Sequence, residues 1–320
     1  MPKKTRSTHS AVEGRSPVAD AISLDSTESG SLVRDFIELT KPEITFLVTL
    51  SSIGGFALAP DEHFDVVAFA ALLIGVCLTS AGASTLNHWL ERDNDALMRR
   101  TMNRPLPAGR ISSNAARNFG CILISAGVGL LCPLTNPLTG AIALATALMY
   151  LFVYTPLKRH STWNTLVGTF PGALPALGGW TAATGSVGWG GAAVFGILAA
   201  WQMPHFLALA WMYRKDYERG GYVMLPVTEP DGRSTVRQTL FFTFVLVTLS
   251  FTPVMLGLIG WLYGAGAGVL GIWFLFAAAA FYRSYSMQDA RRVLRVSIAY
   301  IPALVLIMLI DRIVIGGYFS

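Results

Sequence analysis

Charged residues are scarce in this chain. Of its 320 residues, 13% are Asp, Glu, Lys or Arg, whereas 53% are hydrophobic. Soluble globular domains carry about 25% charged residues, so the composition excludes an ordinary soluble domain. The mean hydropathy is +0.51, and several apolar runs reach the roughly 20 residues that a helix needs to cross a bilayer. The composition therefore predicts an all-α integral membrane protein.

Cysteine is also rare. The three cysteines Cys77, Cys121 and Cys132 all lie inside apolar runs, and their odd number gives no disulfide framework. None has a His or Cys neighbour at the spacing of a metal site. These absences exclude a disulfide-stapled domain and a zinc-binding domain, and we interpret the three residues as small buried apolar side chains.

The N-terminal segment lacks the apolar run that forms the core of a signal peptide. Residues 1–33 are polar and rich in Ser, Thr and basic residues, and we interpret them as a disordered cytoplasmic tail before one multi-helix domain at 34–320. A basic, Ser-rich organellar transit peptide is the alternative. Four acidic residues argue against it: Glu13, Asp20, Asp25 and Glu28.

Apolar runs predict nine membrane-spanning segments. They lie near residues 44–60, 64–92, 114–134, 137–155, 163–184, 188–212, 235–260, 265–285 and 293–315. All 24 Lys and Arg residues except Arg312 precede residue 44 or fall in loops near 92–117, 158–159, 214–237 and 283–295. Because basic loops stay on the cytoplasmic side, this alternation predicts a cytoplasmic N-terminus and an external C-terminus. The same distribution of the net charge of +5 argues against a nucleic-acid partner.

Acidic and amide side chains line the end of the second apolar segment. Asn87, Glu91 and Asp95 are four residues apart, so a helix turns only about 40° between them and presents all three on one face. Asp93 points away from that face. Such oxygen ligands suit Mg²⁺, which proteins usually hold by one or two carboxylates together with substrate phosphates. Four basic residues follow directly: Arg99, Arg100, Arg104 and Arg110. The alternative is a membrane-protein loop that simply ends in mixed charges.

A second polar cluster covers residues 201–227. His205 lies two to three turns inside the membrane end of its segment, and an ionisable residue at that depth is a functional candidate. Asp216 follows eleven residues later, about three turns, so the two share a face if the helix stays regular. The alternative for His205 is a neutral histidine in the protein core. The alternative for Asp216 is an ordinary solvated loop. Lys158 and Arg159 add a third basic loop on the same side, which suits an anionic headgroup bound between helices.

Eight residues match, in order and spacing, the signature of the UbiA superfamily of intramembrane prenyltransferases: Asn87, Glu91, Asp95, Met98, Arg100, Thr101, Arg104 and Gly109. Asn94 departs from it, standing where an aliphatic residue is usual, and we expect this to matter little. Glu91 replaces the commoner Asp and lengthens a metal ligand by one methylene. Five shorter runs resemble more narrowly the protoheme IX farnesyltransferase, or haem O synthase, family: 41–46, 102–109, 201–206, 216–217 and 224–227. The likeness covers about residues 34–315.

The resemblance implies about nine transmembrane helices around a central cavity that opens towards the cytoplasmic side of a bacterial inner membrane. It implies that farnesyl diphosphate donates its C15 chain to a vinyl group of haem B, with water added and pyrophosphate released. The product would serve haem O and haem A synthesis for terminal oxidases. Membrane lipid would surround the chain, and a downstream haem-modifying enzyme or a terminal oxidase would receive the product.

The same resemblance assigns roles to individual residues. Mg²⁺ would be held by Asn87, Glu91, Asp95 and Asp216, and the diphosphate by Arg100, Arg104, Lys158 and Lys215. His205 would orient or ligate the haem or transfer a proton, and His88 would contact the haem or the other substrate. The catalytic candidates are Asp95, Asp216 and His205.

Two alternatives remain open. A UbiA-type enzyme could use another aromatic or tetrapyrrole acceptor; a second full acidic motif, which this chain lacks, would favour that reading. A multi-helix transporter would place its acids near the bilayer midplane, whereas the acids here gather at the cytoplasmic ends of helices.

Overall fold

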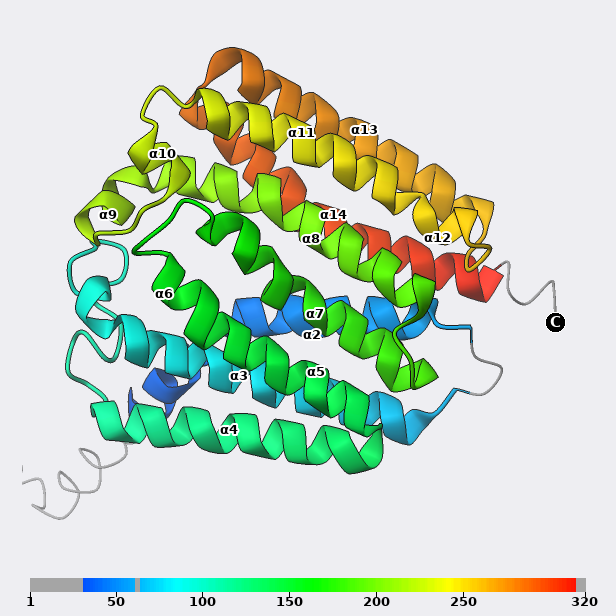
Figure 1. The fold of residues 1–320 in the computed structure, drawn as a ribbon, viewed down its shortest axis with the longest axis horizontal. Coiled ribbons are helices and arrows are strands. Elements are labelled where there is room, and N and C mark those ends of the chain that lie inside the picture. Colours follow the sequence, from blue (N-terminus) through cyan, green and yellow to red (C-terminus); the bar gives the residue numbers. More distant parts are fainter. Residues whose placement is uncertain (1–30, 61–63, 315–320) are drawn as a thin grey trace, which may run out of the picture.

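The computed structural model describes residues 31–60 and 64–314, which form helices and no strand (Figure 1). The elements are α2 (Pro42–Leu58), α3 (Val66–Asp95), α4 (Ser113–Leu134), α5 (Pro137–Leu148), the π-helix η1 (Met149–Tyr154), α6 (Thr155–Leu157), α7 (Asn164–Thr184), α8 (Gly188–Met212), α9 (Arg214–Arg219), α10 (Leu225–Thr228), α11 (Arg233–Ser250), α12 (Thr252–Met255), α13 (Trp261–Ser284) and α14 (Met287–Val314). Residues 31–39 are also helical. The expected boundary between tail and domain, at 33/34, falls inside this helix, and residues 1–30 of the expected tail lie outside the described residues.

Several helices begin at residues that the sequence marks as caps. Asp65 accepts hydrogen bonds from the Val67 and Ala68 amides at the start of α3. Ser112 and Asn136 do the same for α4 and α5. These side chains satisfy amides that have no partner within the first turn. Local sequence therefore fixes where these helices start.

Each of the nine expected segments coincides with helix in the described residues. Seven helical stretches are long and apolar enough to cross a membrane: Val66–Asp95, Ser113–Leu134, Pro137–Leu157, Gly188–Met212, Arg233–Met255, Trp261–Ser284 and Met287–Val314. The other two expected spans correspond to α2, a shorter apolar helix, and to α7. The chain is an all-α integral membrane protein, while the count of nine spans stays a prediction.

The helix α2 is embedded among α3, α7, α8 and α14 (Figure 1). Its closest approach is to α7, where a Cβ on Gly55 would lie 1.9 Å from the Ala176 carbonyl oxygen and a Cβ on Gly179 would lie 1.9 Å from that of Ser52. Only glycine lets the two backbones come so close. This contact places the start of α2, with Lys41, against the charged ends of α3 and α6.

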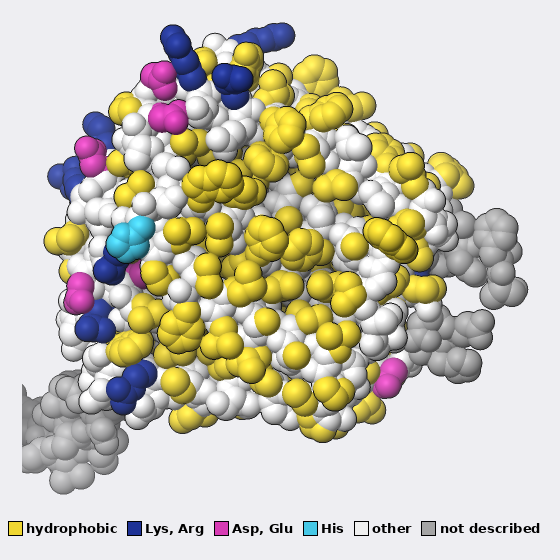
Figure 2. All heavy atoms as spheres, viewed as in Figure 1, with side chains coloured by type: hydrophobic (Ala, Val, Ile, Leu, Met, Phe, Trp, Pro, Cys, Tyr) yellow, Lys and Arg dark blue, Asp and Glu magenta, His cyan; other side chains and the backbone are white. Residues whose placement is uncertain are grey.

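Charged side chains gather mainly at one end of the bundle, the end where α6, α9 and α10 lie, and hydrophobic side chains cover most of the rest of the face in view (Figures 1 and 2). We call this the charged end. Arg312 lies at the opposite end, where its Nη2 donates to the Leu58 carbonyl oxygen over 2.9 Å. Arg312 therefore caps α2, which accounts for the one basic residue that departs from the distribution of the others.

The cysteine expectation is wrong for two residues. Cys77 and Cys121 are exposed on the outside of the bundle, and Cys132 is half-buried. An apolar run in a membrane protein contains residues that face lipid as well as residues that face other helices, so apolar neighbours do not by themselves predict burial inside the protein.

Candidate active site

The last turns of α3 carry Asn87, Glu91 and Asp95 into the protein interior. All three are buried, with at most 5% of their surface exposed. They lie on one face of α3, as their spacing predicts. By contrast, the side chain of Asp93 is 81% exposed and pairs with Arg92 at 3.6 Å. The four-residue spacing thus separated the buried acids from the surface acid correctly.

A cationic side chain meets each of the three buried groups. Lys41 Nζ donates to Asn87 Oδ1 over 2.7 Å, and Lys158 Nζ donates to Glu91 Oε1 over 2.8 Å. Arg104 Nη1 donates to Asp95 Oδ2 over 2.8 Å. These three pairs, which we call the ion-pair cluster, join the start of α2, the end of α3, the loop after α3 and the end of α6. A buried charge is stable only with such partners.

Lys41 is a member of this cluster that spacing and charge did not single out. Its backbone has φ 46° and ψ 69°, a left-handed conformation that is uncommon for a residue other than glycine. This turn leads from the helix at 31–39 into α2 and brings Nζ to Asn87. Burial, and then the nearby guanidinium of Arg104, lower the pKa of Lys41 to about 7. In the sequence, Lys41 is only a single lysine before a proline. Its partner Asn87 becomes apparent only when α2 packs against α3.

Tyrosines surround the ammonium group of Lys158. Its Nζ lies 4.6 Å from the ring centroid of Tyr154 and 5.9 Å from that of Tyr222. Burial works against its charge, but the Glu91 carboxylate prevails and holds the pKa of Lys158 well above its ordinary value. Lys158 therefore stays protonated. Tyr154 belongs to η1, and π-helical turns often occur at functional sites.

Two buried polar groups beside the cluster lack hydrogen-bond partners among the described residues. They are both ring nitrogens of His88 and the Tyr222 hydroxyl, which lies beside the Glu91 carboxylate. Burial raises the pKa of Tyr222 above its ordinary value, so its phenol stays protonated and can donate. Buried polar groups are nearly always satisfied in native proteins, so unpaired ones often mark a place that a ligand fills. His88, predicted as a haem contact, lies beside the buried acids of α3.

The remaining predicted site residues lie nearer the surface of the charged end. The Arg100 guanidinium packs over Tyr213 and Tyr217, with its Cζ 5.1 Å and 6.0 Å from the ring centroids. Asp216 pairs with Arg219 at 3.1 Å, and Lys215 is exposed. Across the described chain, no three His, Cys, Asp or Glu side chains are close enough to hold a metal ion together. Asp216 is therefore not grouped with Glu91 and Asp95 as a ready ligand set.

The condition on which His205 and Asp216 were expected to share one helix face, a regular helix between them, is not met. The helix α8 continues regularly through Pro204 but ends at Met212, and Tyr213 has φ −107° and ψ 19°. Asp216 lies on the separate short helix α9. The spacing of eleven residues could not reveal this break, because neither Met212 nor Tyr213 is a residue type that typically caps a helix.

Asn94, which departs from the family signature, makes two hydrogen bonds at the charged end. Its Nδ2 donates to the Gly220 carbonyl oxygen over 2.7 Å, and its Oδ1 accepts a hydrogen bond from Arg159. An aliphatic side chain could make neither bond. Asn94 thus ties the end of α3 to the segment after α9 and to the basic loop after α6.

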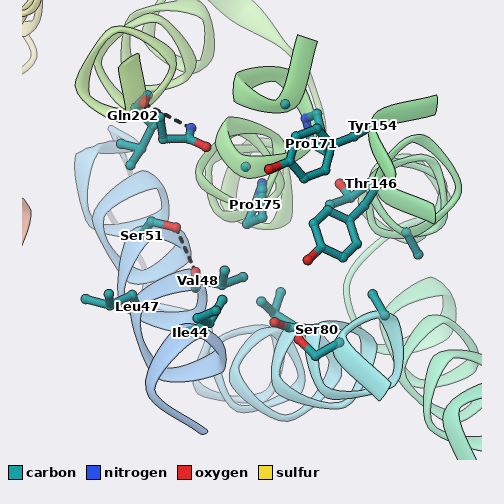
Figure 3. A pocket seen from close by; sticks show the side chains of 18 of the residues that line it. Ile44, Leu47, Val48, Ser51, Ser80, Thr146, Tyr154, Pro171, Pro175 and Gln202 are labelled. Carbon is teal, nitrogen blue, oxygen red and sulfur yellow. Dashed lines mark hydrogen bonds between the residues drawn. The ribbon is translucent and has the colours of Figure 1, made fainter. Parts of the chain in front are cut away.

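An apolar cavity of about 340 Å³ lies inside the bundle, and none of its described lining residues belongs to the ion-pair cluster. Its walls come from α2, α3, α5, η1, α7 and α8, and Figure 3 shows side chains from these elements around the space, among them Ile44, Ser80, Thr146, Tyr154, Pro175 and Gln202. Both Tyr154 and Tyr217 line it, and Tyr154 also touches Lys158. Tyr154 therefore joins the ion-pair cluster to the cavity.

His205 lines the same cavity deeper in α8. Its ring stacks on Trp201, with centroids 5.1 Å apart and planes inclined by 28°. Its Nδ1 lies 2.8 Å from Ser297 Oγ on α14. His205 therefore faces the cavity inside the bundle, and its role as a haem contact stays a prediction.

The oxygen atoms of Asn87, Glu91 and Asp95 are of the chemical type that binds a hard cation. Two carboxylates and one amide oxygen on a single buried helix face are the ligands that Mg²⁺ prefers. In the structure, Arg104 and Lys158 pair with the two carboxylates, and Lys41 donates to the amide oxygen. If an anionic ligand bound the three basic side chains, a cation could bind the oxygens that those side chains now contact.

Comparisons with known proteins agree with this architecture. Residues 47–301 match the model of the UbiA prenyltransferase family. A protein of Salinibacter ruber named protoheme IX farnesyltransferase is 55% identical over 277 residues, which cover 87% of this chain and 98% of that protein. A solved structure described as digeranylgeranylglyceryl phosphate synthase superposes with a TM-score of 0.72 at 18% identity, covering 88% of this chain and 98% of that one. A UbiA homologue from Archaeoglobus fulgidus, bound to GPP and Mg²⁺, gives 0.66 at 13% identity, covering 86% and 99%.

Proposed function

The chain belongs to the UbiA prenyltransferase family, and we propose that it transfers the farnesyl group of farnesyl diphosphate to a vinyl group of haem B. The C–O bond to the diphosphate breaks, a C–C bond to the vinyl group forms, and water supplies a hydroxyl group while a proton leaves. The products are haem O and pyrophosphate. The name of the Salinibacter ruber relative supports this choice of substrates.

One structural observation carries the proposal: Tyr154 lies between a buried cationic cluster and an apolar cavity. A prenyl diphosphate has the same two parts, a highly charged head and an apolar chain. The head would lie beside Lys41, Arg104 and Lys158, and the chain would extend along the cavity. A volume of about 340 Å³ falls within the range of roughly 300–1,000 Å³ that is typical of small-molecule sites.

The residues of the ion-pair cluster would stabilise the leaving diphosphate. Lys158 and Arg104 would turn from carboxylate to phosphate oxygens, which frees Glu91 and Asp95 to hold Mg²⁺ together with Asn87. When bound, Mg²⁺ would neutralise diphosphate charge and thereby favour departure of the leaving group. The Tyr222 hydroxyl, beside Glu91, and the unpaired His88 ring would donate further hydrogen bonds to phosphate oxygens.

The cavity would protect the reacting allylic chain from unwanted water. Its lining is mostly aliphatic and aromatic, with single hydroxyl and amide groups such as those of Ser80, Thr146 and Gln202. Exclusion of water prevents premature hydrolysis of a carbocation-like species. Water needed for the hydroxyl group would then enter only at the acceptor.

We further place the charged end at the cytoplasmic face of a bacterial inner membrane, with the N-terminus cytoplasmic and the C-terminus external. The gathering of basic loops at one end of the bundle supports this orientation (Figure 2). Membrane lipid would cover the apolar outer surface. A haem-modifying enzyme or a terminal oxidase would take up the product, since haem O is too apolar to diffuse freely in water.

Direct conversion tests the proposed function. Purified protein is incubated with haem B, Mg²⁺ and farnesyl diphosphate, and the haem is analysed by mass. The expected product carries one farnesyl group plus one hydroxyl group. Parallel reactions with an aromatic acid acceptor in place of haem test the other acceptor class. Prenylation of that acceptor with no change in haem would refute the proposal.

A further inference from the structure

Ser297, on α14, holds two side chains of α8 at once. Its carbonyl oxygen accepts a hydrogen bond from Trp201 Nε1 over 2.7 Å, and its Oγ lies 2.8 Å from His205 Nδ1. Ser297 is fully buried. Because Trp201 stacks on the imidazole, these contacts fix both the plane and the position of the His205 ring.

The hydrogen-bond directions also fix the tautomer of His205. Ser297 Oγ lies 2.7 Å from the Leu294 carbonyl oxygen, which can only accept. The single hydroxyl proton therefore goes to Leu294, and a lone pair of Oγ faces His205. Both contacts are satisfied only if Nδ1 carries the ring proton and donates it to Ser297. The other nitrogen, Nε2, is then unprotonated and presents a lone pair.

This lone pair belongs to a residue that lines the apolar cavity. Among the described residues that line the cavity, His205 is the only histidine. A neutral imidazole whose far N–H is anchored by a hydrogen bond is the usual arrangement of a metal-ligating histidine, since the anchor orients the ring and raises its basicity. A proximal histidine is also a common ligand of haem iron.

We propose that His205 Nε2 binds the iron of the porphyrin acceptor and that Ser297 is its positioning residue. This inference rests on the proposed function, because it assumes that the acceptor is a haem. Beyond that function, it identifies His205 Nε2 as the atom that binds the acceptor and α14 as the helix that positions it. Iron ligation would fix the porphyrin plane relative to α8 and so determine which ring edge faces the prenyl chain.

Haem titration of the purified full-length protein tests the proposal. Ferric haem B is added to wild-type protein, and the visible and EPR spectra should show a histidine-ligated iron. His205→Ala should lose that spectrum and bind haem more weakly, while its binding of metal-free protoporphyrin IX stays unchanged. Added imidazole should restore the wild-type spectrum in His205→Ala, since it replaces the missing ligand.

Ser297 variants test positioning separately from ligation. Ser297→Ala should weaken haem affinity by about 10- to 100-fold, the usual effect of removing the group that orients a ligating histidine, and should perturb the spectrum. Ser297→Thr, which keeps a hydroxyl, should restore it. Ser250→Ala is the matched control, because it removes another fully buried serine hydroxyl, one that contacts Tyr300 instead. This control should leave the haem spectrum unchanged.

Three results would overturn the inference. A wild-type spectrum in His205→Ala would show that another atom binds the iron. Equal weakening of haem and metal-free porphyrin would show that His205 only shapes the cavity. Normal haem spectra in both variants with lost turnover would make His205 a proton acceptor instead. Failure of wild-type protein to form farnesylated haem would count against the proposed function and is measured separately.

Discussion

Lys158 Nζ lies 2.8 Å from Glu91 Oε1, although 67 residues separate the two along the chain. Their side chains are only 14% and 7% exposed. The pair joins the end of α6 to the end of α3, and it holds a basic side chain of the site against an acidic one. Substitutions in this pair therefore test both the stability of the protein and the chemistry of the site.

Removal of Lys158 should destabilise the protein. We expect Lys158→Met to lower the free energy of unfolding by about 3–5 kcal/mol, because Glu91 keeps a buried and unpaired charge. Thermal unfolding in detergent measures this. Arg159→Met is the matched control, since Arg159 is exposed on the same loop and loss of its hydrogen bond to Asn94 leaves no buried charge unpaired. The double variant Lys158→Met with Glu91→Gln should regain most of the stability and none of the activity. Equal melting temperatures for the Lys158 and Arg159 variants would contradict the assignment.

Loss of the Asp95 charge should abolish turnover without unfolding the chain. Asp95→Asn keeps the shape of the side chain but removes a carboxylate that both Arg104 and the expected Mg²⁺ require, so we expect turnover to fall by at least about 100-fold. Asp93→Asn should be mild, because the Asp93 side chain is 81% exposed. Product formation and the Mg²⁺ dependence of both variants provide the measurement. Normal Mg²⁺-dependent turnover by Asp95→Asn would exclude it as a ligand.

Stability should rise with pH because of Lys41. Its pKa is lowered from 10.5 to about 7 in the folded protein by burial and by Arg104. Between about pH 7 and 10.5 the unfolded chain binds the proton and the folded chain does not. The unfolded state therefore binds more protons, and stability increases with pH across this window. Lys41→Met should flatten this dependence, as melting temperatures recorded between pH 7 and 10 would reveal. An unchanged slope in Lys41→Met would mean that another group titrates.

The proposed orientation makes a further prediction. A reporter fused after Ser320 should read as external, and one inserted within residues 1–30 should read as cytoplasmic, because the basic loops all belong to one side. Alkaline phosphatase and fluorescent-protein fusions distinguish the two sides. If both ends report the same compartment, the number of spans is even and the count of nine is wrong.

Much of this protein was determined by its sequence alone. Scarce charge and long apolar runs specify membrane helices because a bilayer offers no water to an exposed peptide group. Asp65, Ser112 and Asn136 mark helix starts through short-range hydrogen bonds. The spacing of Asn87, Glu91 and Asp95 placed them on one buried face, because that geometry depends only on the helical repeat. Family membership follows from the same local motif.

Tertiary structure alone decided what those residues touch. The sequence did not reveal that Lys41 reaches Asn87 or that Ser297 orients His205 from 92 residues away. The sequence misjudged the burial of two cysteines. It also showed neither the helix break before Asp216 nor the hydrogen bonds of Asn94, because distant packing decides both. The physical reason is that helix periodicity acts over a few residues, whereas an ion pair forms only when helices far apart in sequence pack against each other.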